Sequence, residues 1–569
     1  MQAVACDVAV VGGGPAGSSL ATLLRQSGYT VTLLERERFP RPHVGESMLP
    51  GVLFALGKTG ALERVEKAGF TKKYGATYIW GRGRDPWTIR FSEVPQDRTF
   101  TFQCDREVFD KLLLDHARDE GVDVREGHQV TRAHLTDGRV TGLSFTDEDG
   151  VSGEVRARMC VDASGQWSVL GRQFRLREHN QNLRHVALFG HYHGGPTTLP
   201  DVLDKMEPTD AGNVYVVAVD DGWLWHIPLA GGLRSIGLVT DPERIRGMSR
   251  TERRKYWQRQ IEACDEYKEL LEGGRWAGDF DIVSDWSFIC RRFHGPGYLL
   301  VGDAACFVDP ILASGIALAL QGVLRATKAI RTSLEAPDLT GLAMDWYQEG
   351  YLEQANDFVD MANHWYHGQR LQESWFWTAH RLVDPSQNLS LRQAFVFISS
   401  GLVQDAPEES IRYMGGFTPG QLAVTYEALG LDEGATGTAQ PADVVRQAHP
   451  ERVARPGMAV TQEQALAGVP ALVQGAEVGA WMQEMETGLR PVTRVELPGA
   501  ANGDRREILL SLPTLSVLNL MDGRRRGAEV ARTLAERFAG SMPTDAAALR
   551  PIVGSVIADL AREGAVELG

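Results

Sequence analysis

Three glycines close to the start of the chain carry the strongest chemical signal in the sequence. Gly12, Gly14 and Gly17 follow an apolar run that predicts a strand, and a run of small residues that predicts a helix comes directly after them. Glycine at this spacing lets the backbone turn tightly and approach a pyrophosphate, which the free N–H groups at the start of a helix attract. Glu35 ends the next apolar run, where a carboxylate can accept a hydrogen bond from a ribose hydroxyl. This βαβ pattern therefore predicts a dinucleotide site.

Residues further along the chain point to the same ligand. Arg106 opens a predicted helix, Asp162 ends a strand before a glycine turn, and Gly302-Asp303 follows another apolar run. The prolines and glycine that come after the first motif predict a loop beside the bound nucleotide. Together these motifs resemble those of FAD-binding flavoproteins. The resemblance implies that, besides the three glycines and Glu35, the cofactor is held by Pro15, Ala16, Arg36, Arg41, Ser47, Arg106, Asp162, Gly302, Asp303, Pro310 and Gly315.

These motifs, in this order over residues 6–330, resemble the glutathione-reductase-type, p-hydroxybenzoate-hydroxylase-like flavoprotein fold. Within that fold, the W-x-W-x-I-P run at 223–228 resembles the FAD-dependent halogenases. An ordinary strand would also place both tryptophans on one face, because side chains alternate along a strand. The Gly-Glu-Ser run at 45–47, Lys73 and the run at 304–310 fit the same family. The resemblance is to the branch acting on phenols and pyrroles, which includes the chloramphenicol and chondrochloren halogenases.

The resemblance implies a reaction and a set of reacting groups. Reduced FAD, supplied by a partner flavin reductase, would act with O2 and chloride to generate hypochlorous acid. Lys73 would relay the chlorine to an electron-rich ring, either as an ammonium that holds the acid or as a neutral amine that forms a chloramine. The register to Trp80 favours Lys73 over Lys72. A solvated lysine at a strand end is the alternative interpretation. Catalytic roles are expected for Lys73, Glu46, Trp223 and Trp225.

Chloride requires N–H donors beside the flavin. The backbone amides of Ser314 and Gly315, at the start of a predicted helix, are suited to an anion. Tryptophan halogenases carry a glutamate in this loop, whereas this chain has Leu312 and Ala313, and a histidine of close relatives is replaced by Ala317.

Two further acids are candidates for roles near the reaction. Glu46 is the expected acid near Lys73, although it could instead cap its loop. Asp285 should lie near the flavin, where its carboxylate could orient the cofactor or bond to it, and a surface strand acid is the alternative. No cluster with metal-ligand spacing is visible, so no metal is expected.

The elements that position these residues predict an α/β architecture. We expect a Rossmann-like FAD-binding domain with an inserted, mostly antiparallel sheet for the substrate, then a helical C-terminal region and a winged-helix-like tail. The predicted divisions are a FAD-binding domain at 1–180 and 275–340, with strands in 74–104 contributing to the substrate sheet, the substrate sheet at 181–274, a helical cover at 341–430, an irregular linker at 431–500 and the winged-helix-like module at 501–569.

Composition limits the partners. The formal charge of −15 argues against nucleic acid and against a polybasic membrane anchor, and no apolar run approaches the length of a membrane span. The six cysteines form no CxxC pair, which favours reduced thiols, and the N-terminus lacks the basic region of a signal peptide. We therefore expect a cytoplasmic protein without a membrane or nucleic-acid partner.

Alternatives remain open at this point. A FAD-dependent aromatic monooxygenase that hydroxylates a phenol would share every cofactor motif, as would a reductase of the geranylgeranyl type. The substrate is expected to be a phenolic natural-product precursor, either free or tethered to an acyl- or peptidyl-carrier protein. A basic spot at Arg524–Arg526 could receive such an acidic carrier, although three arginines in a turn are usually only solvated.

Overall fold

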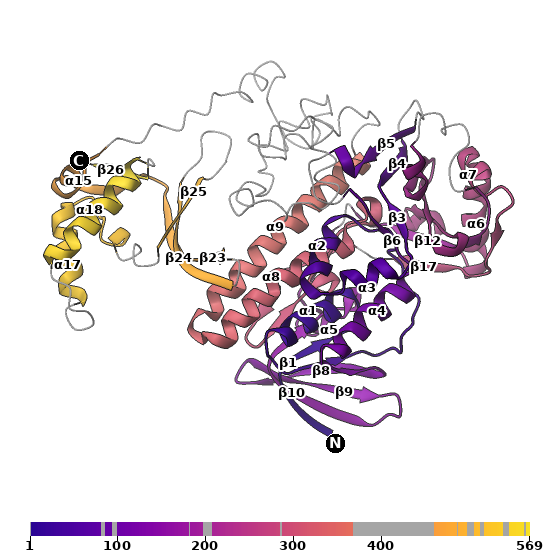
Figure 1. Cartoon of the computed structure of the whole chain (residues 1–569), viewed down its shortest axis with the longest axis horizontal. Helices are drawn as coiled ribbons and strands as arrows, with labels where there is room; N and C mark the ends of the chain where they lie inside the picture. The colour runs from indigo at the N-terminus through magenta and orange to yellow at the C-terminus, as the bar shows by residue number, and fades with distance from the viewer. Residues whose placement is uncertain are drawn as a thin grey trace, which may run out of the picture. The chain divides into compact units, whose positions relative to one another are not determined.

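The computed structural model forms two compact units, residues 1–331 with 347–416 and residues 332–346 with 417–569 (Figure 1). Each unit is considered by itself. The residues that the structure describes are 2–80, 86–93, 99–180, 183–196, 207–284, 287–367, 460–485, 488–497, 506–511, 517–538, 546–562 and 565–568.

The first unit is built on a sheet with β1 (Gln2–Val11) at its centre. Its neighbours β10 (Ser152–Asp162) and β2 (Val31–Leu34) both run parallel to it, and its apolar residues from Val8 to Val11 are buried. A strand buried on both faces reads as a continuous apolar run, as this one does. The other strands of this sheet are β7 (Asp123–Arg125), β8 (His128–Thr136), β9 (Arg139–Asp147), β19 (His294–Gly295) and β20 (Tyr298–Leu300).

Helices cover this sheet and begin where the sequence provides a start signal. Helix α1 (Pro15–Gln26) has Gly14 as its N-cap and proline in its first turn, where a missing N–H costs nothing. Asp105 caps α4 (Arg106–Asp119) by accepting from the backbone N–H of Glu107. The remaining helices of this part are α2 (Gly51–Thr59), α3 (Leu62–Lys67), α5 (Val169–Gln173), α8 (Gly315–Glu335) and α9 (Thr340–His367).

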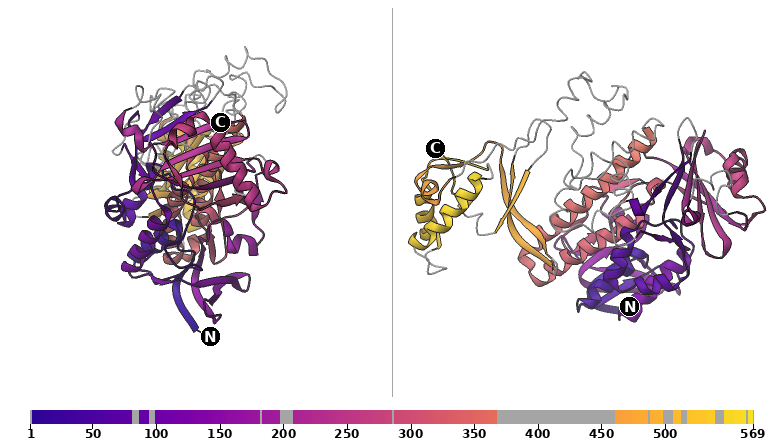
Figure 2. Two further views of the ribbon diagram at one scale, coloured as in Figure 1. Left: turned by 90° about the vertical axis from the view of Figure 1, so that its right-hand side faces the viewer. Right: turned by 45° about the horizontal axis from the view of Figure 1, so that its top comes forward.

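A second, mostly antiparallel sheet has the order β16-β12-β15-β14-β13-β4-β5, with β17 also paired to β12. Helices α6 (Arg250–Ala263) and α7 (Asp265–Leu270) cover one face of it and share an apolar core with it (Figures 1 and 2). Its strands are β4 (Gly75–Ile79), β5 (Pro86–Arg90), β12 (Val186–His193), β13 (Val214–Val219), β14 (Gly222–Pro228), β15 (Leu233–Thr240), β16 (Arg275–Trp276) and β17 (Asp281–Ser284).

The boundaries of this sheet differ from the predicted ones in two places. Residues 275–284 were expected in the FAD-binding domain, but β16 and β17 pair with β12 and so extend the substrate sheet. Strand β6 (Thr101–Gln103) pairs with β3 (Thr71–Lys73) in a separate two-stranded sheet. Both corrections concern pairing between distant segments, which local residue patterns do not encode.

In the second unit the range 431–500, predicted to be an irregular linker, contains regular structure. It holds α15 (Gln462–Ala467) and β22 (Pro470–Leu472), and β23 (Glu477–Met485) pairs with β24 (Gly488–Leu497) in an antiparallel hairpin. The prediction was wrong because the Gly- and Pro-rich composition of the first part of this range was extended over an alternating apolar pattern. The structure from 368 to 459, including most of the predicted helical cover, lies outside the described residues.

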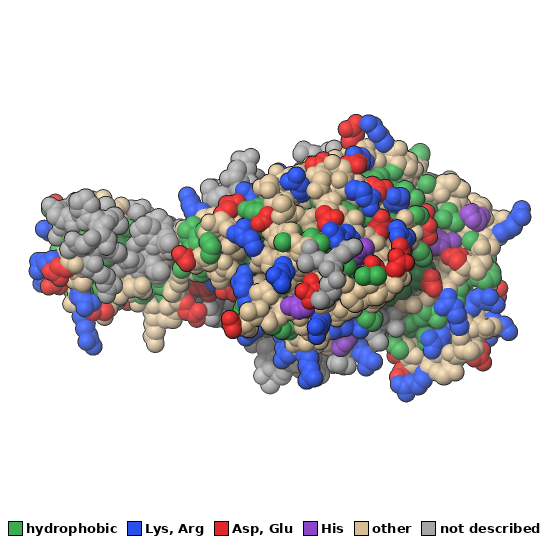
Figure 3. Space-filling view, turned by 90° about the horizontal axis from the view of Figure 1, so that it is seen from below, with side chains coloured by type: hydrophobic (Ala, Val, Ile, Leu, Met, Phe, Trp, Pro, Cys, Tyr) green, Lys and Arg blue, Asp and Glu red, His purple; other side chains and the backbone are tan. Residues whose placement is uncertain are grey.

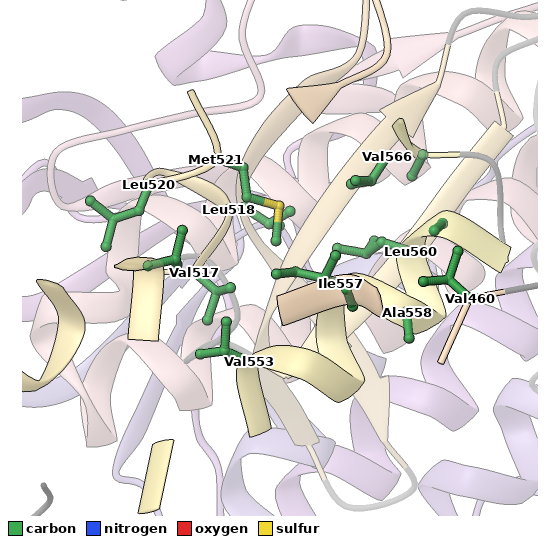
Figure 4. Close-up of a cluster of buried hydrophobic side chains, with 14 of the residues drawn as sticks. Val460, Val517, Leu518, Leu520, Met521, Val553, Ile557, Ala558, Leu560 and Val566 are labelled. Carbon is green, nitrogen blue, oxygen red and sulfur yellow. The ribbon is translucent and has the colours of Figure 1, made fainter. Parts of the chain in front are cut away.

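The tail predicted to be a winged-helix-like module shares its core with residues that precede 501. Its elements are β25 (Arg506–Ser511), α17 (Gly527–Phe538), α18 (Ala546–Arg562) and β26 (Val566–Leu568), and β26 pairs with β22. Val460, Val517, Ile557 and Val566 are among the side chains that point toward one another in this core (Figure 4).

The surface is mixed in charge, with acidic and basic side chains interspersed on the face shown in Figure 3. In the arginine turn, Asp522 accepts from the backbone N–H groups of Arg524 and Arg525 and pairs with the Arg525 guanidinium. All six cysteines are free thiols. Among helices in the described part of the chain, none has the length and apolar composition needed to cross a bilayer.

Candidate functional site

One cavity of about 1270 Å³ in the first unit brings most of the predicted site residues together. It runs from the glycine loop after β1 to the face of the second sheet, so both sheets contribute to its wall. Of the predicted residues, those that border it are Gly12, Gly14, Pro15, Ala16, Glu35, Arg36, Arg41, Glu46, Ser47, Lys73, Arg106, Trp223, Trp225, Asp303, Pro310 and Gly315.

The glycine loop leaves no room for side chains. Gly12 has a φ of +101°, and a Cβ there would lie 2.4 Å from the carbonyl oxygen of Ala163. A Cβ on Gly17 would lie 1.9 Å from the carbonyl oxygen of Gly12, so this glycine lets α1 pack against the strand. Gly302 has a φ of +62°, and a Cβ there would lie 2.9 Å from that of Ala16. These glycines allow close packing, and Gly12 and Gly14 border the cavity, as expected for a loop that approaches a pyrophosphate.

Glu35 is buried at the end of β2, and its carboxylate is engaged with the backbone. One oxygen accepts from the N–H of Gly13 at 2.6 Å and the other from the N–H of Glu37 at 2.8 Å. The carboxylate therefore fixes the glycine loop while still bordering the cavity. Its predicted role toward a ribose stays a prediction.

Arg106 connects α4 to the Gly-Glu-Ser loop. Its guanidinium forms a bidentate pair with Asp110 and donates to the carbonyl oxygens of Val44 and Gly45. Burial raises the pKa of the Asp303 carboxyl to about 7, although the positive charge of Arg106 opposes this shift. Arg106 thus holds the loop from which the next residues reach the cavity.

Asp162 is bonded to the backbone and is set back from the cavity. Its carboxylate accepts from the backbone N–H groups of Ser164 at 3.0 Å and Leu170 at 2.6 Å, and it is absent from the cavity wall. These bonds shape the turn after β10, and the predicted role of Asp162 toward the cofactor stays a prediction. Gly17, Gly302 and Ser314 are also set back from the wall. Asp285 lies outside the described residues.

Lys73 lies at the end of β3 with its side chain buried at the cavity wall. Only 1% of its surface is exposed, and its ammonium position is 2.8 Å from both the Ser47 hydroxyl and the Met48 carbonyl oxygen. Strand β6 makes this contact possible, because it pairs with β3 on one side and bonds the segment around Met48 on the other. Burial lowers the pKa of Lys73 to about 7. Lys72, the other candidate, is exposed.

Trp223 and Trp225 form an aromatic wall on β14. Their ring centroids are 6.0 Å apart, and both rings are almost fully buried. The Trp225 indole N–H donates to the Ser235 hydroxyl, and its ring lies over Gly237 of the neighbouring strand, where a Cβ would be only 2.1 Å away. The Trp223 indole N–H donates to the Tyr366 hydroxyl of α9.

Glu46 does not pair with Lys73. Its Oε1 lies 2.9 Å from Nε2 of His191 on β12, and Nδ1 of the same imidazole lies 2.5 Å from the Asp279 carboxylate. Burial disfavours the charged form of His191, but the hydrogen bonds and charges of Asp279 and Glu46 outweigh this effect and raise its pKa to about 10. The sequence analysis did not identify His191 or Asp279. The one signal for His191 was that it lies two residues after Phe189 and so shares a face of the strand with it.

A second missed cluster surrounds Asp309. Its carboxylate accepts from the Tyr366 hydroxyl at 3.0 Å and from the backbone N–H of Ile311, and His185 lies 3.5 Å away. Because Tyr366 also accepts from Trp223, this cluster ties the tryptophan wall to the loop before α8.

The expected chloride site lies at the start of α8. Gly315 and Ile316 border the cavity, and the N–H groups of a first helical turn have no acceptor within the helix. Ala313 precedes them with a φ of +54°, a conformation that non-glycine residues rarely adopt. The assignment of chloride to Ser314 and Gly315 stays a prediction.

The cavity fits FAD. Gly12 and Gly14 border it where a pyrophosphate would lie, its lining extends from this loop to the second sheet, as an extended dinucleotide requires, and Asp303 contributes to its wall. These residues come from the two separated segments that the sequence predicted, after β1 and after β20.

Comparison with protein families agrees with this geometry. Residues 95–409 match the model of the family described as tryptophan halogenase, and residues 7–173 match that of FAD-dependent oxidoreductases. A tryptophan 2-halogenase of Chondromyces crocatus is 32% identical over 70% of this chain and 76% of its own length. A 1H-pyrrole-2-carbonyl-[peptidyl-carrier protein] chlorinase of Pseudomonas fluorescens is 30% identical over 60% of this chain and 79% of its own.

Solved structures show the same likeness. The myxobacterial chondrochloren halogenase CndH is 31% identical, with a TM-score of 0.59 over 75% of this chain and 97% of its own. CmlS, a flavin-dependent halogenase, shares the fold at 23% identity, with a TM-score of 0.63 over 99% of this chain and 96% of its own. These matches give no support to the hydroxylase alternative, and they confirm the predicted FAD-dependent oxidoreductase fold. The chain belongs to the tryptophan halogenase family of flavin-dependent halogenases.

Proposed function

We propose that this halogenase transfers electrophilic chlorine through Lys73 to an electron-rich, phenolic ring. The observation that carries the proposal is the environment of the Lys73 amine, which is buried at the cavity wall against two neutral oxygens. No carboxylate among the described residues pairs with it, so no nearby negative charge holds it in the protonated form. Near neutral pH a substantial fraction is therefore the free amine, the form that reacts with hypochlorous acid.

The chemistry that reduced FAD supplies when bound is the activation of O2, by which chloride is oxidised to hypochlorous acid. The residues that would hold the cofactor are the glycine loop, Arg41, Arg106 and Asp303. At Lys73 the nitrogen lone pair would form an N–Cl bond as the Cl–O bond breaks, and the released hydroxide would take one amine proton to become water. Chloride would bind at the first-turn amides of α8, at Ser314 and Gly315.

The substrate end of the cavity is apolar and aromatic, with Trp223 and Trp225 forming its wall. Such a wall excludes water and holds a flat ring, which suits a small phenol. The Pseudomonas relative acts on a pyrrole tethered to a peptidyl-carrier protein. We therefore include carrier-bound as well as free aromatic substrates, with a flavin reductase as the partner that supplies reduced FAD.

The test is a halogenation assay read by mass spectrometry. The enzyme would be incubated with a flavin reductase, NADH, O2 and chloride or bromide, and with phenolic acids offered free and as carrier-bound thioesters. A product with the isotope pattern of the halogen is the expected result. Hydroxylation of a ring without halogen incorporation would overturn the proposal.

A further inference from the structure

Glu46 borders the cavity with its two carboxylate oxygens in different situations. Oε1 accepts from His191, whereas Oε2 is buried and has no hydrogen-bond partner among the described residues. Buried polar atoms nearly always have a partner in a working protein, and an ionised oxygen without a donor is especially unfavourable. Oε2 is therefore an acceptor for a group that enters the cavity.

His191 holds this carboxylate in place. Its imidazole is bonded on both sides, by Glu46 at Nε2 and by Asp279 at Nδ1, and its own backbone N–H donates to the other Asp279 oxygen at 3.0 Å. A ring bonded at both nitrogens to carboxylates is a donor at both, which is the imidazolium form. All three residues border the cavity, and their side-chain exposure rises from 5% at Glu46 to 22% at His191 and 46% at Asp279.

We propose that His191, held by Asp279, is a positioning residue that keeps the Glu46 carboxylate aimed at the acidic proton of the aromatic substrate. That proton belongs to a hydroxyl or N–H group on the ring to be halogenated. The inference rests on the proposed function in taking the substrate to be an electron-rich aromatic. It adds two residues, His191 and Asp279, that no sequence motif of the chain pointed to.

The proposed step moves chlorine from Lys73 to the ring. A ring carbon forms its bond to chlorine as the N–Cl bond at Lys73 breaks, and the electron pair of that bond returns to nitrogen. The phenolic proton moves to Oε2 of Glu46, so the oxygen can push electrons into the ring without building up positive charge. The chlorinated dienone then becomes aromatic again by losing its ring proton to water and regaining one on oxygen. Glu46 releases its proton and the Lys73 nitrogen takes one up.

Two substitutions at one position separate the two hydrogen bonds of the ring. His191→Gln places an amide N–H close to where Nε2 lay and keeps the donor to Glu46, whereas His191→Asn places it close to Nδ1 and keeps only the contact with Asp279. With 4-methylphenol as the probe, we expect product formation to fall about tenfold in the asparagine variant and less than about threefold in the glutamine variant. The rate at which O2 reoxidises enzyme-bound reduced FAD should equal that of the wild type in both.

The methyl ether of the probe, 4-methylanisole, has no acidic proton and serves as the matched ligand. Calorimetric titration of the enzyme loaded with oxidised FAD should show about tenfold tighter binding of the phenol than of the ether, a preference kept by His191→Gln and lost by His191→Asn. Equal preferences in the two variants, or no preference in the wild type, would overturn the inference. If the wild type halogenates neither this probe nor the phenolic acids, the proposed substrate class fails, and the binding preference still decides the role of His191.

Discussion

Two basic side chains, Lys73 and His191, border the same cavity, and their surroundings push them toward opposite charge states. Lys73 is buried against a hydroxyl and a carbonyl oxygen, and burial lowers its pKa to about 7. His191 is also partly buried, but two carboxylates bond its ring and raise its pKa to about 10. Burial alone therefore does not set the protonation state of a basic group; the charge of its hydrogen-bond partners does. One cavity can thus hold a reactive neutral amine and a permanent cation.

The largest expected effect comes from removing the amine. Lys73→Met should lower the yield of halogenated product by at least about 100-fold, because Lys73 is the one lysine that the described residues place at the cavity wall. Lys72→Met is the matched control, since that neighbouring lysine is exposed, and it should leave the yield unchanged. Both variants should bind FAD with the absorbance spectrum of the wild type. Retention of halogenation by Lys73→Met would remove the lysine from the mechanism.

The second largest effect is the change in halogenation efficiency with pH. Since the folded-state pKa of Lys73 is about 7, the fraction of free amine should rise about eightfold between pH 5.5 and 6.5 and level off above about pH 8. The measurement is the ratio of ring-halogenated product to oxidant that escapes to a scavenger such as monochlorodimedone. His191 stays charged over this range and should contribute no change. A ratio that falls as pH rises would favour an ammonium that only holds hypochlorous acid by a hydrogen bond.

Much of the cavity could be predicted from sequence because its residues are set locally. The glycines and Glu35 lie directly beside strands whose apolar pattern is visible, so spacing along the chain fixes where they point. Lys73 was identified instead by its register to Trp80 in a run that resembles a family motif. His191 could not be assigned in this way. Its partners Asp279 and Glu46 are 88 and 145 residues away in sequence. The pairing of β12 with β16 and β17 brings Asp279 close, and Glu46 comes from the separate loop that Arg106 holds.

The same reasoning explains the errors in domain boundaries. Strands β16 and β17 have no local feature that assigns them to one sheet or the other, and their register with β12 settles the matter. In the range 431–500, composition indicated a linker, although Val478 and Met482 lie on strand β23 of an antiparallel hairpin. Composition averaged over a long range conceals a short alternating segment, which is the more specific signal.

Stability should show opposite pH dependence at the two positions. Lys73 has a lowered pKa in the folded state, so it destabilises the protein below pH 7, and this penalty shrinks as pH rises toward 10.5. His191 has a raised pKa, so its stabilising effect is complete below pH 6.5 and declines as pH rises toward 10. The measurement is the difference between the thermal midpoints of the wild type and of each variant. Between pH 6 and 9, the difference between wild type and Lys73→Met should rise and that between wild type and His191→Gln should fall, each by roughly 1–4 °C. Two differences that change in the same direction would contradict the assigned charge states.

The smallest expected effect is that of Asp279→Asn. This substitution weakens the difference in charge state between Lys73 and His191 while keeping a side chain of the same size at position 279. The amide oxygen can still accept from His191, but one of the two negative charges that stabilise the imidazolium is lost, so the pKa of His191 should fall toward its ordinary value. Halogenation of 4-methylphenol should then equal that of the wild type at pH 6 and drop about two- to fivefold at pH 8.5, where the variant ring is neutral and Glu46 loses its cationic partner. Steady-state product formation at the two pH values measures this, with 4-methylanisole as the control that should show no drop. A loss of equal size at both pH values would mean that Asp279 supports the fold of the β16–β17 connection rather than the charge of His191.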